Sequence, residues 1–234
     1  MTLAVQLAQI REEIATTCRR ANRSDSEVAL MAVTKTHPAE VVAEAYAAGL
    51  RLFGENRVQE WQEKSSALAH LTNADYHLIG PLQSNKAARA AELFDAIDAV
   101  DSLKVATRLD AVARALGKRL PILIEVKLSH EESKHGLTPA ELPGLLEALA
   151  PLDFLIPTGL MTVPPWSENP EDARPYFREL RRLRDASLAA CPTLTQLSMG
   201  MSGDFAVAIE EGSTCVRIGS ALFGRRSYPK QAKA

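Results

Sequence analysis

A lysine closes an uncharged run in the segment ALMAVTKTH, which spans residues 29–37. Residues 29–34 carry no charge, and Lys35 comes directly after them. On one interpretation its aliphatic stem lies along the end of a strand and its ammonium reaches water. On the other, the amine lies in a dry cavity that disfavours its charged form, so its pKa falls and it attacks a carbonyl to form a Schiff base. Lys35 alone does not decide between the two.

Glycine and serine recur near the far end of the chain, in the segments SMGMSGD and RIGSALFG. The first contains Gly200 and Ser202, and the second contains Gly219 and Ser220. Small residues leave backbone N–H groups exposed at helix starts, where the aligned peptide dipoles favour an anion. The alternative is that these are ordinary turn glycines with a serine N-cap. Because the pattern occurs in two loops, it favours a phosphate site.

Arg217 lies inside an apolar run, between Val216 and Ile218. A charge there is costly unless it is paired. It either forms a structural ion pair with a strand-end carboxylate or presents a guanidinium to a ring nitrogen of a ligand. Pyridoxal 5'-phosphate (PLP) chemistry combines a lysine Schiff base, a phosphate clamp and a partner for the pyridine nitrogen. A guanidinium only donates hydrogen bonds, so it would keep that nitrogen unprotonated and weaken the ring as an electron sink.

Short apolar runs alternate with longer amphipathic runs along the whole chain. After a first helix over residues 3–21, the predicted strands cover 28–33, 50–56, 75–80, 94–101, 119–128, 153–161, 195–200 and 214–220. The helices that follow them cover 38–48, 58–68, 84–92, 103–116, 139–149, 172–190 and 204–211, with a brief turn after the last strand. Eight short strands, each followed by a helix, predict a parallel sheet covered by helices. Their regularity favours a single closed (β/α)8 TIM barrel over an open doubly wound sheet.

The composition indicates a globular protein of one large domain. The chain has 234 residues, a hydrophobic fraction of 46% and a formal net charge of -2, which gives no reason to expect a nucleic acid or an anionic membrane as partner. Three widely spaced cysteines, Cys18, Cys191 and Cys215, predict a reducing compartment, without a zinc site or a disulfide framework. No apolar stretch reaches membrane-spanning length and no signal peptide is visible, so we expect a cytoplasmic protein.

We expect this domain to span residues 1–234, with a helix and connection at 1–27, the barrel at 28–224 and a tail at 225–234. Chemistry in such barrels lies at the carboxyl ends of the strands. Further candidates lie in or just after the last part of predicted strands: Asn56, His77, Gly80, Ser84, Asn85 and Met161. His77 is either a core histidine or a catalytic base, and Asn56 either contacts a ligand and Lys35 or caps the next helix. The other four histidines, His37, His70, His130 and His135, have no metal-binding spacing.

Seven segments, in chain order, resemble the pyridoxal phosphate homeostasis proteins (the YggS/PROSC family): AVTKTHP, FGENRVQE, HLIGPLQSNK, EESKHGL, GLMTV, LSMGMSGDF and GSTCVRIGSALFG. They run from about residue 28 to residue 228. The resemblance implies a barrel like the N-terminal domain of alanine racemase, without the C-terminal β domain of that enzyme. It also implies PLP held as a Schiff base.

The resemblance also implies roles for individual residues. Lys35 matches the PLP lysine, and Arg217 matches the residue that faces the pyridine nitrogen. The phosphate-binding loops are matched by Ser198, Gly200, Ser202, Gly219 and Ser220, and residues near the ring by Asn56 and Met161. With His77 added, these residues form the predicted cofactor-binding set. Two positions depart from the family, since Lys127 stands where many members carry asparagine and Arg57 where many carry tyrosine.

The resemblance implies a protein that binds and passes on PLP and influences amino-acid and keto-acid balance without robust turnover. Racemisation needs two acid/base groups on opposite faces of the substrate carbon, and Lys35 supplies one. Expected partners are PLP and PLP-dependent apo-enzymes, and we expect a monomer or a weak homodimer. Two alternatives stay open. One is a PLP-dependent racemase or lyase of narrow range, and the other is an aldolase-type barrel that forms a Schiff base without a cofactor.

Overall fold

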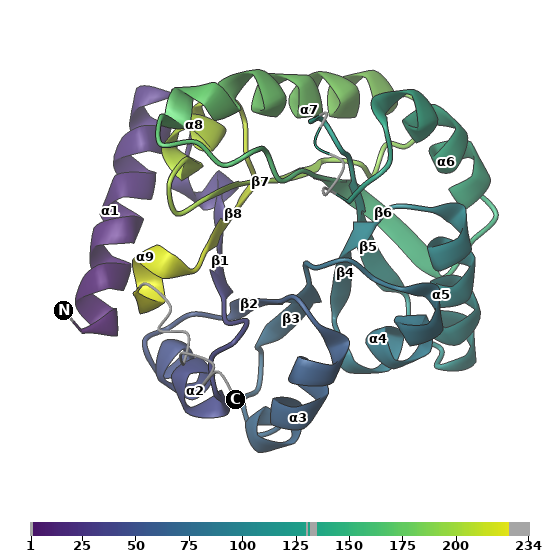
Figure 1. The fold of residues 1–234 in the computed structure, drawn as a ribbon, viewed down its shortest axis with the longest axis horizontal. Helices are drawn as coiled ribbons and strands as arrows, with labels where there is room; N and C mark the ends of the chain where they lie inside the picture. Colours follow the sequence, from purple (N-terminus) through teal and green to yellow (C-terminus); the bar gives the residue numbers. More distant parts are fainter. Residues whose placement is uncertain (1, 130, 132–134, 225–234) are drawn as a thin grey trace, which may run out of the picture.

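A closed barrel of eight parallel strands forms the centre of the computed structural model, which describes residues 2–129, 131 and 135–224 (Figure 1). The strands pair in chain order, and β1 pairs with β8 to close the barrel. They are β1 (Ala29–Val33), β2 (Leu52–Glu55), β3 (Asp75–Leu78), β4 (Ala96–Val100), β5 (Leu120–Glu125), β6 (Leu155–Met161), β7 (Gln196–Met201) and β8 (Cys215–Ile218). The predicted TIM barrel is therefore confirmed. His130, residues 132–134 of the EESK segment and the predicted tail lie outside the described residues.

Helices surround the barrel as a ring (Figure 1). They are α1 (Leu3–Arg20), α2 (Ala39–Ala47), α3 (Val58–Leu68), α4 (Ala87–Leu93), α5 (Leu103–Ala115), α6 (Leu142–Leu149), α7 (Arg174–Ser187), α8 (Phe205–Glu210) and α9 (Ser220–Phe223). Short 3₁₀ turns are η1 (Asp25–Glu27), η2 (Ser84–Lys86), η3 (Pro139–Glu141) and η4 (Pro170–Ala173). The prediction for α3 is correct at both ends. The helices predicted over 84–92 and 139–149 begin with the 3₁₀ turns η2 and η3, which precede α4 and α6.

The two faces of each strand have different neighbours. Phe53 and Tyr76 face the outer helices, because the Tyr76 ring stacks on Phe53 and lies 4.2 Å from the ring of Trp61 in α3. Gly54 directly follows Phe53 on β2 and therefore faces inward, where a Cβ would come within 2.8 Å of Met31 Sδ. The alternation of side chains along a strand thus separates an outer core, packed on helices, from an inner layer.

The N-terminal helix α1 covers a gap in the ring. Among the described residues the last helix is α9, which has four residues and cannot cover the seam between β8 and β1 alone. In Figure 1, α1 runs beside α8 and α9, and contacts with both helices bury its apolar side. The apolar side chains buried on α1 are Leu3, Leu7, Ile10, Ile14 and Cys18. The helix therefore belongs to the hydrophobic core of the barrel.

Within the described part of the chain, no helix combines the length and the apolar character needed to cross a membrane. The same residues contain no cluster of histidine, cysteine and acidic side chains that could hold a metal ion. The division of the chain at residues 27 and 224 stays a prediction.

Candidate functional site

Lys35 lies in the turn between β1 and α2, at the carboxyl end of the barrel. Its side chain is half-buried. The residue before it, Thr34, is fully buried and continues the pairing of β1 with β2, since its N–H donates to the carbonyl of Gly54. The Thr34 hydroxyl donates to Oε1 of Glu55 at 2.6 Å. The backbone that leads into Lys35 is therefore fixed to the end of the neighbouring strand.

A buried lysine of α3, Lys64, forms hydrogen bonds with the backbone of the same turn. Lys64 Nζ lies 2.7 Å from Glu55 Oε1 and donates at 3.0 Å to the carbonyls of both Thr34 and His37. These carbonyls flank Lys35 on either side. Because one ammonium binds both, its position sets the geometry of the turn that carries Lys35.

A second carboxylate completes this arrangement. Glu60 accepts a short hydrogen bond from the backbone N–H of Thr36 and lies 3.4 Å from Lys64 Nζ. Thr36 has a φ of 66°, a left-handed conformation that is unusual for a β-branched residue. The Glu60 carboxylate therefore binds the N–H of Thr36 at the point where the backbone has this unusual conformation. We call Thr34, Glu55, Glu60 and Lys64 the Lys64 cluster.

Glu55 is fully buried, and its Oε2 has no hydrogen-bond partner among the described residues. Burial raises the pKa of the Glu55 carboxyl, while Lys64 and the Thr34 hydroxyl oppose this shift. This pair was not predicted from the sequence. The available signal was the position of Lys64 on the apolar face of α3, where Val58, Trp61 and Leu68 are also buried. A charge on an apolar stripe indicates a buried partner.

The turns after β7 and β8 meet through Ser202. Its Oγ accepts hydrogen bonds from the backbone N–H groups of Gly219 and Ala221, both at 3.3 Å. A Cβ added to Gly219 would lie 3.5 Å from Cβ of Val33, two residues before Lys35. The two loops predicted to bind phosphate therefore meet, and the turn that carries Lys35 lies beside them.

The two glycines of these turns have different structural roles. Gly200 has a φ of 94°, and a Cβ there would lie 2.5 Å from Cβ of Ala208 in α8. Local packing and backbone conformation therefore account for Gly200. Gly219 has a negative φ, and a Cβ there would make only ordinary contacts. The fold itself does not require a glycine at position 219.

Arg217 is buried in β8 and donates to two neutral acceptors. Its Nη1 lies 2.8 Å from Ser198 Oγ, and its Nη2 lies 2.9 Å from the carbonyl of Thr162. Burial lowers the pKa of the guanidinium, and nearby groups that include Asp98 and Glu125 oppose this shift. No carboxylate of a described residue forms a salt bridge with it. The structure therefore does not show Arg217 in a structural ion pair, which was the other interpretation of this residue.

His77 in β3 pairs with a carboxylate of β4. Its Nδ1 lies 3.0 Å from Oδ1 of Asp98, whose side chain is almost fully buried. Burial lowers the pKa of the imidazole, but the charge of Asp98 and its hydrogen bond outweigh this effect and raise the pKa above its usual value. Asp98 was not among the predicted site residues, although an aspartate between Ile97 and Ala99 in an apolar strand indicates a buried partner.

The remaining candidates lie at or after the carboxyl ends of other strands. Asn56 follows β2, and a Cβ on Gly80 would lie 2.3 Å from its carbonyl oxygen, so the two loops are in contact. Asn56 does not cap α3, because Arg57 occupies the N-cap position.

Met161 ends β6 and packs with Ala99 and Leu123 in a cluster separate from the helix-packed core. Ser84 and Asn85 begin η2, and Lys127 is half-buried after β5.

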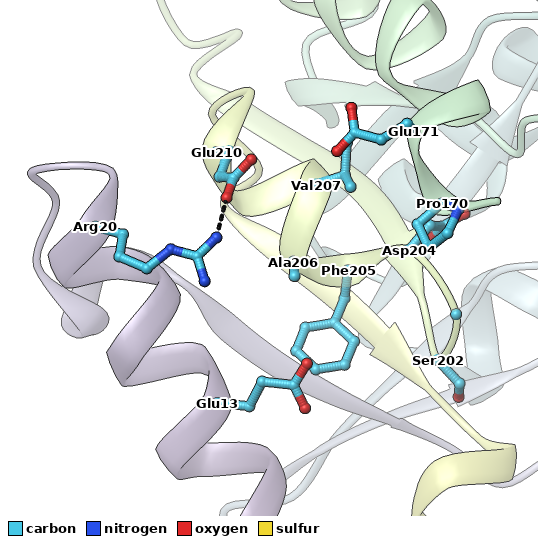
Figure 2. Close-up of a pocket in the computed structure, with 11 residues that line it drawn as sticks. Glu13, Arg20, Pro170, Glu171, Ser202, Asp204, Phe205, Ala206, Val207 and Glu210 are labelled. Atoms are coloured by element: carbon cyan, nitrogen blue, oxygen red, sulfur yellow. Dashed lines mark hydrogen bonds and ion pairs between the residues drawn. The ribbon is translucent and has the colours of Figure 1, made fainter.

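Outside the barrel, a hollow of about 410 Å³ lies between α1 and α8, with Ser202 among its lining residues (Figure 2). Its lining includes four carboxylates: Glu13, Glu171, Asp204 and Glu210. Arg20 pairs with Glu210 across it at 2.7 Å. The surplus of carboxylates makes this hollow unfavourable for an anion. The side of the Ser202 turn that suits an anion is the side facing Gly219.

Comparison with known proteins identifies the family. A family model described as "Alanine racemase, N-terminal domain" matches residues 5–227. The pyridoxal phosphate homeostasis protein of Aquifex aeolicus is 43% identical over 229 residues, which cover 97% of this chain and 100% of that protein. This chain belongs to the pyridoxal phosphate homeostasis protein family. The family member of Escherichia coli is also 43% identical, over 98% of this chain and 99% of its own length.

Solved structures agree with this family assignment. PipY of Synechococcus elongatus, solved without PLP, is 40% identical, covers 95% of this chain and 100% of its own, and superposes with a TM-score of 0.87. The same protein with PLP bound gives a TM-score of 0.81. Alanine racemase of Clostridium difficile is 15% identical with a TM-score of 0.72, and the match covers 94% of this chain and 60% of that enzyme. At this identity the racemase shows a shared barrel fold and no more.

Proposed function

We propose that this protein binds PLP, attached through a Schiff base to Lys35, and serves intracellular PLP homeostasis as a carrier or regulator. The observation that carries the proposal is the solved structure of PipY with PLP bound, because PipY is 40% identical over nearly the whole chain. The names of the curated relatives from Aquifex aeolicus and Escherichia coli support the homeostasis role.

The residues at the barrel mouth fit PLP. The backbone N–H groups of Gly219 and Ala221 converge on one oxygen, Ser202 Oγ, and such donors suit a phosphate. The turn that carries Lys35 lies beside them, through the contact of Val33 with Gly219. A phosphate on one side and an aldehyde within reach of an amine are the two requirements of this cofactor.

The proposal assigns a role to each residue of the predicted cofactor-binding set. Bound PLP supplies an aldehyde that condenses with amines. Lys35 would hold the cofactor covalently, and Arg217 would donate a hydrogen bond to the pyridine nitrogen. The phosphate would lie among Ser198, Gly200, Ser202, Gly219 and Ser220. The ring would lie near Asn56, His77 and Met161.

The carrier role is preferred to catalysis because of Arg217. Its guanidinium is buried, and its hydrogen bonds go to the neutral acceptors Ser198 and Thr162. A group that only donates hydrogen bonds leaves the pyridine nitrogen unprotonated, so the ring stabilises a carbanion poorly. We therefore propose that amino-acid racemisation by the purified protein stays well below about 1 s⁻¹.

The proposal extends to partners and location. PLP-dependent apo-enzymes would receive the cofactor, in the cytoplasm, from a monomer or a weak homodimer. The N-terminal helix, the barrel and the tail would act together as a single domain.

The test is an absorption spectrum of the purified protein with PLP, before and after borohydride reduction, followed by peptide mapping. We expect a reducible band and a label on Lys35. Lys35→Ala should abolish the label while the far-UV circular dichroism stays unchanged, and Lys127→Ala serves as the matched control that keeps it. A label on another lysine would falsify the assignment of Lys35, and a protein that binds no PLP would overturn the proposed function.

A further inference from the structure

We propose that a cleft beside the barrel mouth is a binding site for small molecules that carry at least two acidic groups. The cleft has a volume of about 490 Å³, within the range of small-molecule sites. The polar side chains that line it are Asn56, Arg57, Gln59, Gln83, Lys86 and His135. We call it the basic cleft.

Within the described residues, no acidic group neutralises the positive charge of the cleft. Arg57, Lys86 and His135 line it, and no carboxylate is among its lining residues. None of the three side chains forms a hydrogen bond or an ion pair within the part of the chain that the structure describes. Arginines elsewhere on the surface are commonly paired, as are Arg19 with Glu12 and Arg182 with Glu179. Basic groups held together without an acidic partner attract anions.

Helix α3 adds to this attraction. It has 11 residues and begins at Val58, which lines the cleft together with Gln59. The N-cap residue of this helix is Arg57, and its side chain makes no capping hydrogen bond to the N–H groups of the first turn. The N–H groups at the positive end of the helix dipole therefore add to the charges of the side chains.

The distribution of the basic groups indicates more than one acidic group on the ligand. Arg57 precedes α3, Lys86 ends η2, and His135 belongs to the loop after β5. The three groups thus come from three separate segments around one cleft. A ligand with two or three carboxylates or phosphates on a short carbon frame can bind groups on different segments at once. The amides of Asn56, Gln59 and Gln83 would hydrogen-bond the polar parts between them.

The cleft also adjoins the Lys64 cluster. Asn56 lines the cleft and directly follows Glu55, which binds Lys64. Gly80 precedes the lining residues Pro81 and Leu82, and its backbone lies close to the Asn56 carbonyl. A ligand in the cleft would therefore contact the loop that supports the turn of Lys35.

Titration calorimetry with citrate and inorganic phosphate at constant ionic strength tests the proposal. The full-length protein is first loaded with PLP and reduced with borohydride, so that covalent cofactor fills the proposed PLP site. We expect citrate to bind at least about tenfold more tightly than phosphate, because it has several carboxylates. Equal affinities would overturn the multi-acid class. The absence of binding by either anion at millimolar concentration would overturn the site.

Substitutions locate the binding. Arg57→Gln combined with Lys86→Gln should weaken citrate binding about tenfold or more. Arg119→Gln is the matched control, because Arg119 is exposed and precedes β5 at the opposite end of the barrel. In the unsubstituted protein, citrate should also shift the ring signals of His135 in NMR spectra. If the double substitution leaves the affinity for citrate unchanged, the anion binds elsewhere and the proposal is overturned. The same titration is repeated on protein without PLP. It measures citrate binding to the basic cleft without relying on PLP attachment to Lys35, so that a failure of this proposal can be distinguished from a failure of the proposed function.

Discussion

The two sides of the barrel mouth are built in different ways. On the side of β1 and β2, buried charged side chains hold the turn of Lys35, with Lys64 bound to Glu55 and to the Thr34 and His37 carbonyls. On the side of β7 and β8, a neutral hydroxyl of Ser202 and backbone N–H groups join the two turns. The amine is thus positioned by charges from other elements, whereas the proposed anion site is made of small residues and backbone.

This difference implies different sensitivities to substitution. Removing one member of a buried ion pair leaves the other charge buried without its partner, which costs far more than removing one neutral hydrogen bond. We therefore expect large losses of stability on the side of β1 and β2. On the side of β7 and β8, we expect large losses only where packing, as at Gly200, forbids a side chain.

The largest effect is expected for Lys64→Met. It leaves the buried Glu55 carboxylate without its ammonium, so the free energy of unfolding should fall by about 3–5 kcal/mol in urea titrations. Lys104→Met, an exposed change on α5, is the matched control and should stay within about 0.5 kcal/mol. The double variant Lys64→Met with Glu55→Leu should recover part of the loss. A Lys64→Met protein as stable as the control would remove the contrast between the two sides.

Gly200→Ala tests the one position on the other side where we expect a large loss. Its φ is 94° and the added Cβ would approach Ala208 to 2.5 Å, so we expect a loss of about 2 kcal/mol or more. Gly219→Ala is the matched partner, because its φ is negative and its contacts are ordinary, and it should cost less than about 1 kcal/mol. Both values come from urea unfolding. Equal losses for the two glycines would contradict their different roles.

Ser202→Ala sharpens the comparison from the same side. It removes the oxygen that accepts from the Gly219 and Ala221 amides, and these N–H groups can turn to water at the barrel mouth. The free energy of unfolding should fall by about 1 kcal/mol. Hydrogen exchange at the two amides should accelerate, while the turn of Lys35 keeps its protection. Unchanged exchange at residues 219 and 221 would show that Ser202 does not join the turns.

The smallest effect concerns the His77–Asp98 pair, which extends the charged pattern to β3 and β4. The pKa of His77 is raised in the folded protein, so protonation of His77 stabilises the fold. This contribution is fully present below about pH 6.5 and is lost as the pH rises through the folded-state pKa of His77. Asp98→Asn should lower the His77 pKa in NMR titrations and remove that pH dependence. A His77 pKa that does not respond to Asp98→Asn would rule out the pairing.

The sequence predicted the order of the elements better than their ends. The alternation of apolar and amphipathic runs gave all eight strand–helix pairs, because side-chain period reflects local backbone geometry. Strand ends were less accurate. The strand predicted over 119–128 is β5 over Leu120–Glu125, because the chain then leaves the ladder and Val126 bridges to Leu137. The start of α4 was also misplaced, since η2 takes up Ser84–Lys86.

The sequence by itself determined the barrel topology, the serine and glycine turns after β7 and β8, and a lysine at the end of β1. These features depend on residues close together in the chain, where periodicity and turn chemistry act. Tertiary structure alone decided the partners. Glu55 with Lys64, His77 with Asp98, and Arg217 with Ser198 and Thr162 each join separate elements. Such contacts depend on which buried groups the closed barrel brings within hydrogen-bond distance, and residue spacing along the chain does not specify that.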